Sequence, residues 1–551
     1  MSKLSHGMGL VLSCVVAVVV LVVMPISLSI AHSHIHSHDS QAQSEEVKRC
    51  IPKKFSGSES FVCVCNSTYC DTVSSYDPLT STKFTVFSSS SASDRLAKHV
   101  YNISEQSNIT DHGLKFTVDA SLRYQTVIGF GGAFTDAAGM NFFNLSVGAQ
   151  DLLIKSYFSS NGIEYTMGRI PMASCDFSTH PYSYDDNNGD FSLENFSLAK
   201  EDLQFKIPMI KSALEHSSRP VKLFGSPWSA PAWMKTNGHM NGKGQLIGEP
   251  GGKYFKTWAQ YFVRFVEEYK KKNLTLWGLT VQNEPIDGAI KHFPFQAMHF
   301  TAEMERDFIK LDLGPALESS GLQPIHLMML DGQSFHLPTW PQMVLGDPEA
   351  KRFVSGIGVH WYIDKYTPYE LKLSETHQLF PEQFLLYTEA CYDSTFSSKS
   401  VDLGSWSRGE GYSKSIITVM NNWVTGWVDW NLALNMEGGP NWAKNYVDSP
   451  ILVNASNDEF YKQPMYYHLG HFSKFIVPGS VRIGTSRQET GDIKMDSVYS
   501  VAFSLPDGSR TFVILNMANE EYPISIHDPS VGFINGVLPP RAIQTYIWKP
   551  S

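Results

Sequence analysis

The sequence predicts an α/β protein built from a (β/α)8 barrel, a β-sandwich and a small disulfide-stapled β-sheet module. At 551 residues the chain is too long for one ordinary hydrophobic core, so we expect a barrel-sized domain and smaller ones beside it. Short apolar runs with strand character alternate with longer helical segments through the middle of the chain, and four cysteines crowd near its start. An apolar fraction of 42% indicates a well-packed globular protein.

The first 31 residues have the three parts of a secretory signal. Lys3 supplies a basic start, GLVLSCVVAVVVLVVM is the hydrophobic region, and small residues after Pro25 end at a cleavage site following Ala31. A retained signal anchor is the alternative, because the run approaches the ~17 residues that span a bilayer. We expect an unstructured tail rather than a metal site from the alternating histidines that follow, His32, His34, His36 and His38.

Cysteine usage and glycosylation sequons also indicate the secretory route. We expect disulfides rather than a zinc site in the segment with Cys50, Cys63, Cys65 and Cys70, because a single residue separates the middle pair, unlike zinc-finger spacing. A formal net charge of -10 argues against nucleic acid as a partner. Seven sequons predict surface glycosylation, at Asn66, Asn102, Asn108, Asn144, Asn195, Asn273 and Asn454.

Eight strand-like runs between about residues 121 and 430 predict the barrel. The segment TWAQYFVRFVEEYKKK, between the third and fourth runs, places its aromatic residues on one helical stripe. A doubly wound open sheet is the alternative, but GFGGAF lacks the glycine spacing of a dinucleotide-binding turn. The runs are VIGFGG, IEYTMGRIP, VKLFGSPW, LWGLTVQNEP, IHLMMLDG, GIGVHWY, FLLYTEACY and GWVDWNLALN.

The C-terminal stretch from Val481 predicts a β-sandwich. VYSVAF and TFVILN alternate around the turn residues Pro506, Asp507 and Gly508, which is typical of antiparallel strands. The strand-like segments 83–87 and 114–118 near the N-terminus are candidates for the same domain.

Two glutamates follow strands of the predicted barrel, Glu284 after the fourth run and Glu389 after the seventh. Catalytic groups of such barrels project from the C-terminal ends of strands, where residues distant in sequence meet. One protonated and one ionised carboxyl group are what glycosidic cleavage needs, and a separation of ~5–5.5 Å predicts retention through a covalent intermediate. A single glutamate there is more often a structural ion-pair partner, but two at suitable positions predict a glycosidase.

Other residues near strand ends suit a sugar ligand. Asp176, Asn283 and Asn445 can hydrogen-bond hydroxyl groups. Aromatic faces suit the apolar face of a sugar ring, although each tryptophan taken alone is more often a core residue. The tryptophans near predicted strand ends are Trp228, Trp361, Trp427 and Trp430.

Long motifs from about Cys50 to the C-terminus resemble the lysosomal glucosylceramidases (acid β-glucosidases, glucocerebrosidases) of glycoside hydrolase family 30. They include PMASCDFS, KTNG, NGKG, TVQNEP, HWY, EAC, VDWNLALN, EGGPNW and YHLGHFSKFI. The resemblance implies Glu284 as general acid/base, Glu389 as nucleophile, and Arg169 as a neighbour that helps to keep the nucleophile ionised. It implies substrate contacts from Asp176, Trp228, Asn283, Tyr362, Trp430 and Asn445.

The same resemblance implies the disulfides Cys50–Cys63 and Cys65–Cys70 and a three-part architecture. After a signal at 1–31, residues 50–76 and 432–463 form the small antiparallel sheet module. Residues 79–124 and 480–551 form an immunoglobulin-like β-sandwich. Residues 125–431 and 464–479 form the catalytic barrel.

The implied reaction is hydrolysis of glucosylceramide to glucose and ceramide, without metal or organic cofactor, at an anionic membrane surface in the lysosome. A saposin-type activator and a lysosomal sorting receptor are the implied partners, and membrane association is peripheral. Alternatives are a retaining glycosidase acting on a glucan, xylan or galactosyl lipid, a non-hydrolytic sugar-binding or chaperone-like glycoprotein, and a retained type II membrane protein.

One residue departs from the family pattern as the vertebrate enzymes show it. Where they read AENEP this chain reads VQNEP, so Gln282 replaces a carboxylate two residues before Glu284. We expect this side chain to point away from the cleft. If it lies close, the loss of a negative charge lowers the pKa of Glu284.

Overall fold

The computed structural model describes residues 47–76, 80–322, 324–392, 399–490 and 495–550. The predicted signal and the histidine-rich tail lie outside these residues. The described part of the chain contains no helix that is both long enough and apolar enough to cross a membrane.

Eight parallel strands form the closed barrel, and each of the eight predicted runs contributes one of them. The barrel prediction is therefore confirmed and the open sheet is excluded. Neighbours pair in chain order, and β13 closes the ring by pairing with β6. The strands are β6 (Gly129–Ala133), β7 (Met167–Met172), β8 (Lys222–Pro227), β9 (Leu276–Thr280), β10 (His326–Gln333), β11 (Val354–His360), β12 (Phe384–Glu389) and β13 (Val424–Asn431).

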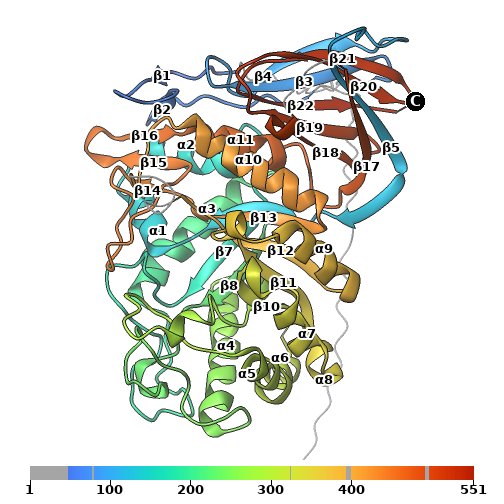
Figure 1. Cartoon of the computed structure of the whole chain (residues 1–551). Coiled ribbons are helices and arrows are strands. Elements are labelled where there is room, and N and C mark those ends of the chain that lie inside the picture. Colours follow the sequence, from blue (N-terminus) through green and yellow to red (C-terminus); the bar gives the residue numbers. More distant parts are fainter. Residues whose placement is uncertain (1–46, 77–79, 323, 393–398, 491–494, 551) are drawn as a thin grey trace, which may run out of the picture. The chain divides into compact units, whose positions relative to one another are not determined.

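Helices surround the strands (Figure 1). The predicted aromatic helix is α4 (Lys253–Lys271), whose aromatic stripe is buried while Lys270 and Lys271 end it, as the helix dipole favours. The other α-helices are α1 (Asp136–Phe143), α2 (Val147–Phe158), α3 (Ile207–His216), α5 (Ala302–Phe308), α6 (Gly314–Ser319), α7 (Thr339–Leu345), α8 (Pro348–Lys351), α9 (Tyr369–Leu379), α10 (Trp406–Asn421) and α11 (Pro464–Ser473).

The β-sandwich joins both ends of the chain, as Figure 1 shows by blue and red strands side by side. Its nine-stranded sheet folds back on itself: Phe116 of β5 packs against Phe512 of β19 at 5.0 Å, although two strands separate them in the sheet. The strands are β3 (Lys83–Ser90), β4 (Ala97–Asn102), β5 (Gly113–Thr126), β17 (Val481–Thr490), β18 (Val498–Ser504), β19 (Arg510–Asn516), β20 (Tyr522–Asp528), β21 (Gly532–Leu538) and β22 (Ala542–Trp548).

A five-stranded sheet forms the third unit, and it contains β1 (Pro52–Lys53), β2 (Val62–Asn66), β14 (Leu434–Asn435), β15 (Ile451–Asn454) and β16 (Glu459–Lys462). Disulfides join Cys50 to Cys63 and Cys65 to Cys70, the pairing that the resemblance implies. The sheet is not wholly antiparallel, which corrects that expectation. β14 runs parallel to β15 because residues 436–450 provide a crossover long enough to return the chain in the same direction. The unit boundaries stay predictions.

Candidate active site

The barrel interior holds an apolar layer and, one step further along the strands, a polar layer. Since side chains on a strand alternate with period two, residues two positions after an inward-facing residue also face inward. Met167 is thus followed by Arg169, Phe224 by Ser226, and Leu386 by Thr388, all of them buried. The apolar layer consists of Met167, Phe224, Met328, Leu386 and Val428, and it forms the floor beneath the polar groups.

A bulge in β10 places Asp331 at the centre of the polar layer. The register with β11 shifts between Leu330 and Gly332, and both Leu330 and Asp331 have positive φ, 67° and 50°. Bulges of this kind redirect side chains next to active sites. Gly358 on β11 makes room, because a Cβ there would lie 3.1 Å from Asp331 Cα and 3.2 Å from Thr388 Oγ1.

Asp331 is fully buried and accepts four hydrogen bonds. The donors are Arg169 Nη2 at 2.8 Å, Thr280 and Thr388 Oγ1 at 2.6 Å each, and His360 Nε2 at 3.0 Å. Burial raises the pKa of Asp331, but the Arg169 charge and the His360 contact outweigh burial and hold the pKa well below its usual range. Asp331 is therefore a permanent negative charge beneath the two glutamates.

Glu389 ends β12 and stays 8% exposed at its side chain. Arg169 Nη1 pairs with Glu389 Oε2, and the Tyr362 hydroxyl donates to Glu389 Oε1 at 2.7 Å. Arg169 also donates to Asn283 Oδ1 at 2.8 Å through Nη2, which ties the segment after β9 to the nucleophile candidate. Planar guanidinium geometry suits this multiple contact.

Glu284 lies four residues beyond the end of β9, with a φ of 42° and a side chain that is 17% exposed. Its backbone N–H donates to Asp331 O at 2.9 Å, which fixes the bend. Its Oε1 accepts from Gln333 Nε2 at 2.7 Å and faces His360 Nδ1 at 2.9 Å. Burial raises the pKa of Glu284, but the hydrogen bond and charge of His360 lead the contacts that lower it below its ordinary value.

His360 bridges two carboxyl groups with its two ring nitrogens, to Glu284 on one side and Asp331 on the other. Carboxylates only accept hydrogen bonds, so both nitrogens carry protons. Burial lowers the pKa of His360, but the surrounding carboxylates raise it to about 10. A doubly protonated ring has no lone pair for a metal ion, so the cluster of Glu284, His360 and Glu389 is not a metal site in this protonation state.

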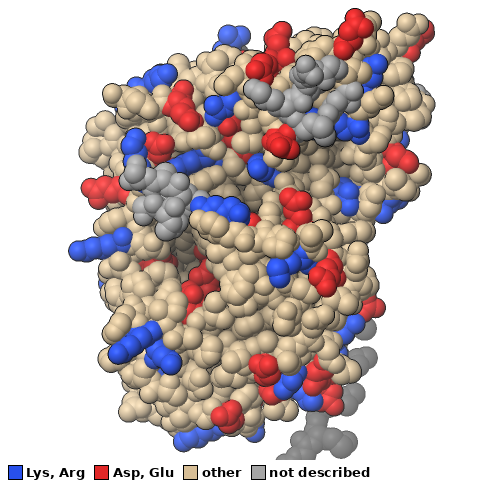
Figure 2. All heavy atoms as spheres, viewed as in Figure 1, with Lys and Arg blue, Asp and Glu red and all other residues tan. Residues whose placement is uncertain are grey.

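Barrel closure brings the two glutamates together. One carboxylate oxygen of Glu284, one of Glu389 and a ring nitrogen of His360 all lie within 4.8 Å of one another. Such proximity of the two oxygens fits the ~5–5.5 Å spacing of a retaining carboxyl pair better than the ~6.5–9.5 Å spacing of an inverting pair. On the face shown in Figure 2, acidic side chains lie inside a hollow.

The predicted sugar contacts form a second group beside Glu389. Asp176 is buried, and its Oδ2 accepts from Asn441 Nδ2 and Asn445 Nδ2 at 3.0 Å each. Burial raises the pKa of Asp176 to about 7, against the effect of the Asn445 hydrogen bond.

The tryptophans divide into two sets. Trp228 and Trp430 stack with ring centroids 5.2 Å apart, next to the Arg169 guanidinium. Trp361 and Trp427 pack edge-to-face with each other and both contact Tyr412, which makes them core residues.

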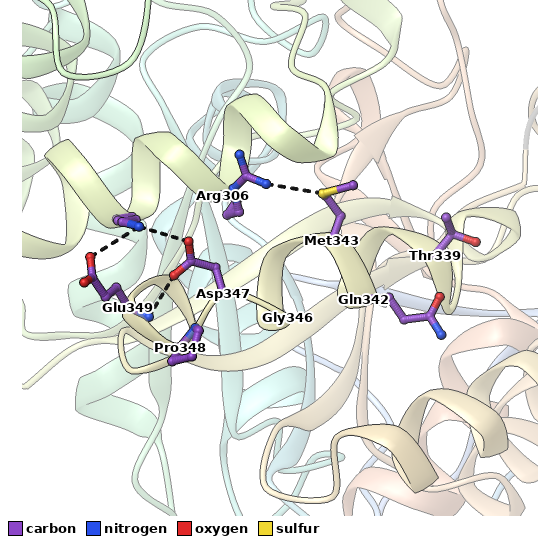
Figure 3. A pocket seen from close by; sticks show the side chains of 9 residues that line it. Arg306, Thr339, Gln342, Met343, Gly346, Asp347, Pro348 and Glu349 are labelled. Atoms are coloured by element: carbon purple, nitrogen blue, oxygen red, sulfur yellow. Dashed lines mark hydrogen bonds and ion pairs between the residues drawn. The ribbon is translucent and has the colours of Figure 1, made fainter.

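A groove of about 750 Å³ lies elsewhere, between α5, α7 and α8 (Figure 3). Lys310 forms ion pairs with its acids Asp347 and Glu349 at 3.0 and 3.3 Å. The groove is lined by Arg306, Lys310, Thr339, Gln342, Met343, Gly346, Asp347, Pro348 and Glu349.

The predicted glycosylation sites all lie at least partly on the surface. Asn66 and Asn454 are half-buried, and the other five are exposed: Asn102, Asn108, Asn144, Asn195 and Asn273. Their modification stays a prediction.

Sequence reasoning missed Asp331, His360 and Gln333. His360 and Gln333 do end strands of the barrel, which is the signal that could have identified them. The inward orientation of Asp331 depends on the bulge in β10, which no residue pattern predicts.

Comparison with known proteins agrees with this geometry. Residues 127–476 match the glycosyl hydrolase family 30 TIM-barrel domain, and residues 479–546 match the family's beta sandwich domain. The chain is 51% identical over 501 residues to lysosomal acid glucosylceramidase of Mus musculus, which covers 91% of this chain and 95% of the mouse protein. It is 46% identical over 495 residues to putative glucosylceramidase 4 of Caenorhabditis elegans, covering 89% and 93%. The solved structure of SrfJ from Salmonella typhimurium superposes with a TM-score of 0.76 at 29% identity, covering 85% of this chain and 100% of that one. With its opposed carboxyl groups at the mouth of the barrel, the chain belongs to glycosyl hydrolase family 30.

Proposed function

We propose that the protein is a retaining β-glucosidase that hydrolyses glucosylceramide to glucose and ceramide. The observation that carries the proposal is that one carboxylate oxygen of Glu284, after β9, lies within 4.8 Å of one carboxylate oxygen of Glu389, at the end of β12. Glu389 attacks the anomeric carbon, and Glu284 protonates the leaving oxygen and later activates water. The likeness to glucosylceramidases supports the substrate.

Exposed apolar side chains on the loops after three barrel strands support a lipid substrate. Ile290 follows β9, Phe335 follows β10 and Tyr366 follows β11, and they are 51%, 41% and 75% exposed. These loops leave the same end of the barrel as the two glutamates. Exposed apolar groups around a polar site suit a substrate whose ceramide stays in a bilayer. We therefore propose peripheral action at an anionic membrane, helped by a saposin-type activator, after receptor-mediated delivery to the lysosome.

Covalent labelling with a cyclitol epoxide, followed by peptide mapping, tests the roles of the two glutamates. We expect the label on Glu389 and none in Glu389→Gln. Glu284→Gln should slow turnover by ~10²–10⁴-fold and still take up some label, because a general acid contributes about that much. Glu349→Gln is the control, since this exposed acid lies in the groove of Figure 3.

Label on any other residue would overturn the assignment. A parallel panel of glucosylceramide, a β-glucan, a xylan and a galactosyl lipid tests the substrate. We expect the highest kcat/KM for glucosylceramide in anionic vesicles, and a clear preference for one of the polysaccharides would contradict the proposal.

A further inference from the structure

A second carboxyl group contacts Glu284 and has no part in the mechanism proposed above. Asp287 begins the 3-10 turn η3 (Asp287–Ala289), and its backbone N–H donates to Glu284 O at 3.0 Å. This turn brings the Asp287 side chain back to Glu284, and the two carboxyl groups form a hydrogen bond. Asp287 lies three positions after Glu284, so the contact is fixed by the local fold of the chain.

Two carboxyl groups joined by a hydrogen bond share a proton, because two carboxylates offer acceptors only. The neighbours decide which group holds it. The cationic His360 faces Glu284 and favours its ionised form. Burial, then the charge of Glu284, raises the pKa of Asp287 to about 10. At mildly acidic pH the proton therefore resides mainly on Asp287 while Glu284 is ionised.

This distribution presents a difficulty for a general acid. Glu284 must deliver a proton to the glycosidic oxygen, yet next to His360 it would be ionised if it stood alone. We propose that Asp287 is a positioning residue for the acid step, and that it holds the proton which Glu284 passes to the leaving oxygen. The inference rests on the proposed function and assigns a source for the proton of that same site.

The protons and charges balance over both steps. In the first step the Glu389 carboxylate bonds to the anomeric carbon, the bond to the leaving oxygen breaks, the Asp287 proton moves to Glu284, and Glu284 passes a proton on to that oxygen. The pair then retains no proton and carries two negative charges, while Glu389 has become a neutral ester. In the second step the water oxygen bonds to the anomeric carbon while Glu284 takes its proton, the ester bond breaks and frees the Glu389 carboxylate, and the proton returns to Asp287, which restores the starting state.

The total charge of the three carboxyl groups is therefore the same before and after the first step. That constancy matters in a buried site, where an extra charge is costly. The charged or titratable groups around the pair are His360 from β11, Arg169 from β7 and Glu389 from β12, with the neutral Gln333 from β10 also bound to Glu284.

The test is the pH dependence of kcat/KM for the full chain, measured with an aryl β-glucoside whose leaving group needs protonation. In Asp287→Asn the proton is gone and an amide donates to Glu284, so the alkaline limb should move down by at least about one pH unit. One unit corresponds to roughly tenfold less activity on that limb. The kcat/KM of Asp287→Asn at acidic pH should change much less. Asp287→Glu keeps a carboxyl group, so its alkaline limb should lie close to that of the unmodified protein.

A dinitrophenyl β-glucoside provides the second measurement, because its leaving group departs without a proton. The turnover of this substrate by Asp287→Asn should stay close to that of the unmodified protein. A merely structural defect would instead lower the turnover of both substrates at every pH. Asp312→Asn is the matched control: this buried acid accepts from Gly251 N at 2.7 Å and should leave the limb in place.

An unmoved alkaline limb in Asp287→Asn, or an equal loss with both substrates across the pH range, would overturn the inference. Failure of the proposed function looks different. The unmodified protein would then take no cyclitol label on Glu389, a result obtained before any variant of Asp287 is made.

Discussion

The two glutamates at the mouth of the barrel have contrasting neighbours. Glu389 contacts Arg169 and the Tyr362 hydroxyl. Burial lowers the pKa of Arg169, but Asp331 and Glu389 raise it further above its high ordinary value, and burial raises the pKa of Tyr362 well above its own. Neither group changes charge at any pH where the protein works. Glu284 instead contacts the titratable imidazolium of His360 and the carboxyl group of Asp287, the group that we propose holds its proton.

The difference follows what each group must do in a double displacement. A nucleophile has to be ionised whenever substrate arrives, so partners of fixed charge suit it. An acid/base group has to gain and lose a proton in each turnover, so partners that can carry a proton suit it. Asp331 connects the two surroundings, since it binds both Arg169 and His360.

The largest effect should come from Arg169→Met, which removes the fixed charge beside Glu389. It leaves Glu389 without its cation and Asp331 with that of His360 alone, and breaking a buried pair in this way costs ~3–5 kcal/mol of unfolding free energy. We expect a matching loss in denaturant unfolding and no measurable hydrolysis. Arg169→Lys should recover stability only in part, because a lysine cannot reproduce the bonds to Ser226, Asn283 and both acids.

Arg219→Met is the control for the loss of a half-buried, ion-paired guanidinium. Arg219 binds Glu164 at 3.1 Å and lies outside the polar layer. It should lower stability while the folded fraction keeps its activity. If Arg169→Met folded normally and still hydrolysed substrate, the fixed-charge account of Glu389 would be wrong.

His360→Asn should have a smaller effect on stability, ~1–3 kcal/mol, and an opposite effect on the pH profile to Asp287→Asn. Without the imidazolium the pKa of Glu284 rises, so the alkaline limb of kcat/KM should move to higher pH. The pKa of His360 is raised from 6.5 to about 10, so its stabilisation is complete below pH 6.5 and is lost as pH rises toward 10. The stability deficit of the variant should shrink over that range.

His471→Asn is the matched control for this variant. His471 is equally buried, but it binds the hydroxyl groups of Ser89 and Thr545, and burial lowers its pKa to about 3. It is neutral over the working range, so its replacement should not move the limb. If the alkaline limb of kcat/KM moved to lower pH in His360→Asn, the imidazolium would not be what lowers the pKa of Glu284.

The fold was predictable from the sequence because its signals are local. Each barrel strand is a short apolar run ending at polar residues, and α4 carries an unbroken aromatic stripe. The return of β14 to run parallel with β15 was not predictable from the same signals, since strand direction depends on where the chain between them passes. The family resemblance, rather than periodicity, supplied the disulfide pairing.

The site was predictable only for residues that motifs mark. Glu284 and Glu389 stand at strand ends, and Arg169 lies in a strand, so barrel geometry or the resemblance identifies them. Asp331 faces the site because of a register shift and two positive φ angles, and Asp287 reaches Glu284 through a single 3-10 turn. Both depend on backbone conformation that one sequence does not display.

Gln282→Glu should give the smallest effect on the alkaline limb of kcat/KM, and it tests the residue that departs from the family pattern. Gln282 is fully buried, and its Nε2 donates to the carbonyl oxygens of Trp228 at 2.8 Å and Asn283 at 3.0 Å. A carboxylate there would face two acceptors, so the new acid should stay protonated with a raised pKa. Its stability should match that of the unmodified protein below pH ~4. Between the pKa of an exposed glutamate and the raised pKa in the fold, stability should fall by about 1.4 kcal/mol for each pH unit.

Melting temperatures between pH 4 and pH 7 measure this slope, and Gln125→Glu is the control. Gln125 also donates to two backbone carbonyls, but its oxygen accepts from Arg482 Nε at 3.0 Å, so an acid at this position has a cation to pair with. Its slope should therefore be shallower. Because the acid at position 282 is neutral, the alkaline limb of kcat/KM should move less than in either His360→Asn or Asp287→Asn. A shift as large as in those two variants would contradict this expectation. It would mean that a charge at position 282 acts directly on the pKa of Glu284.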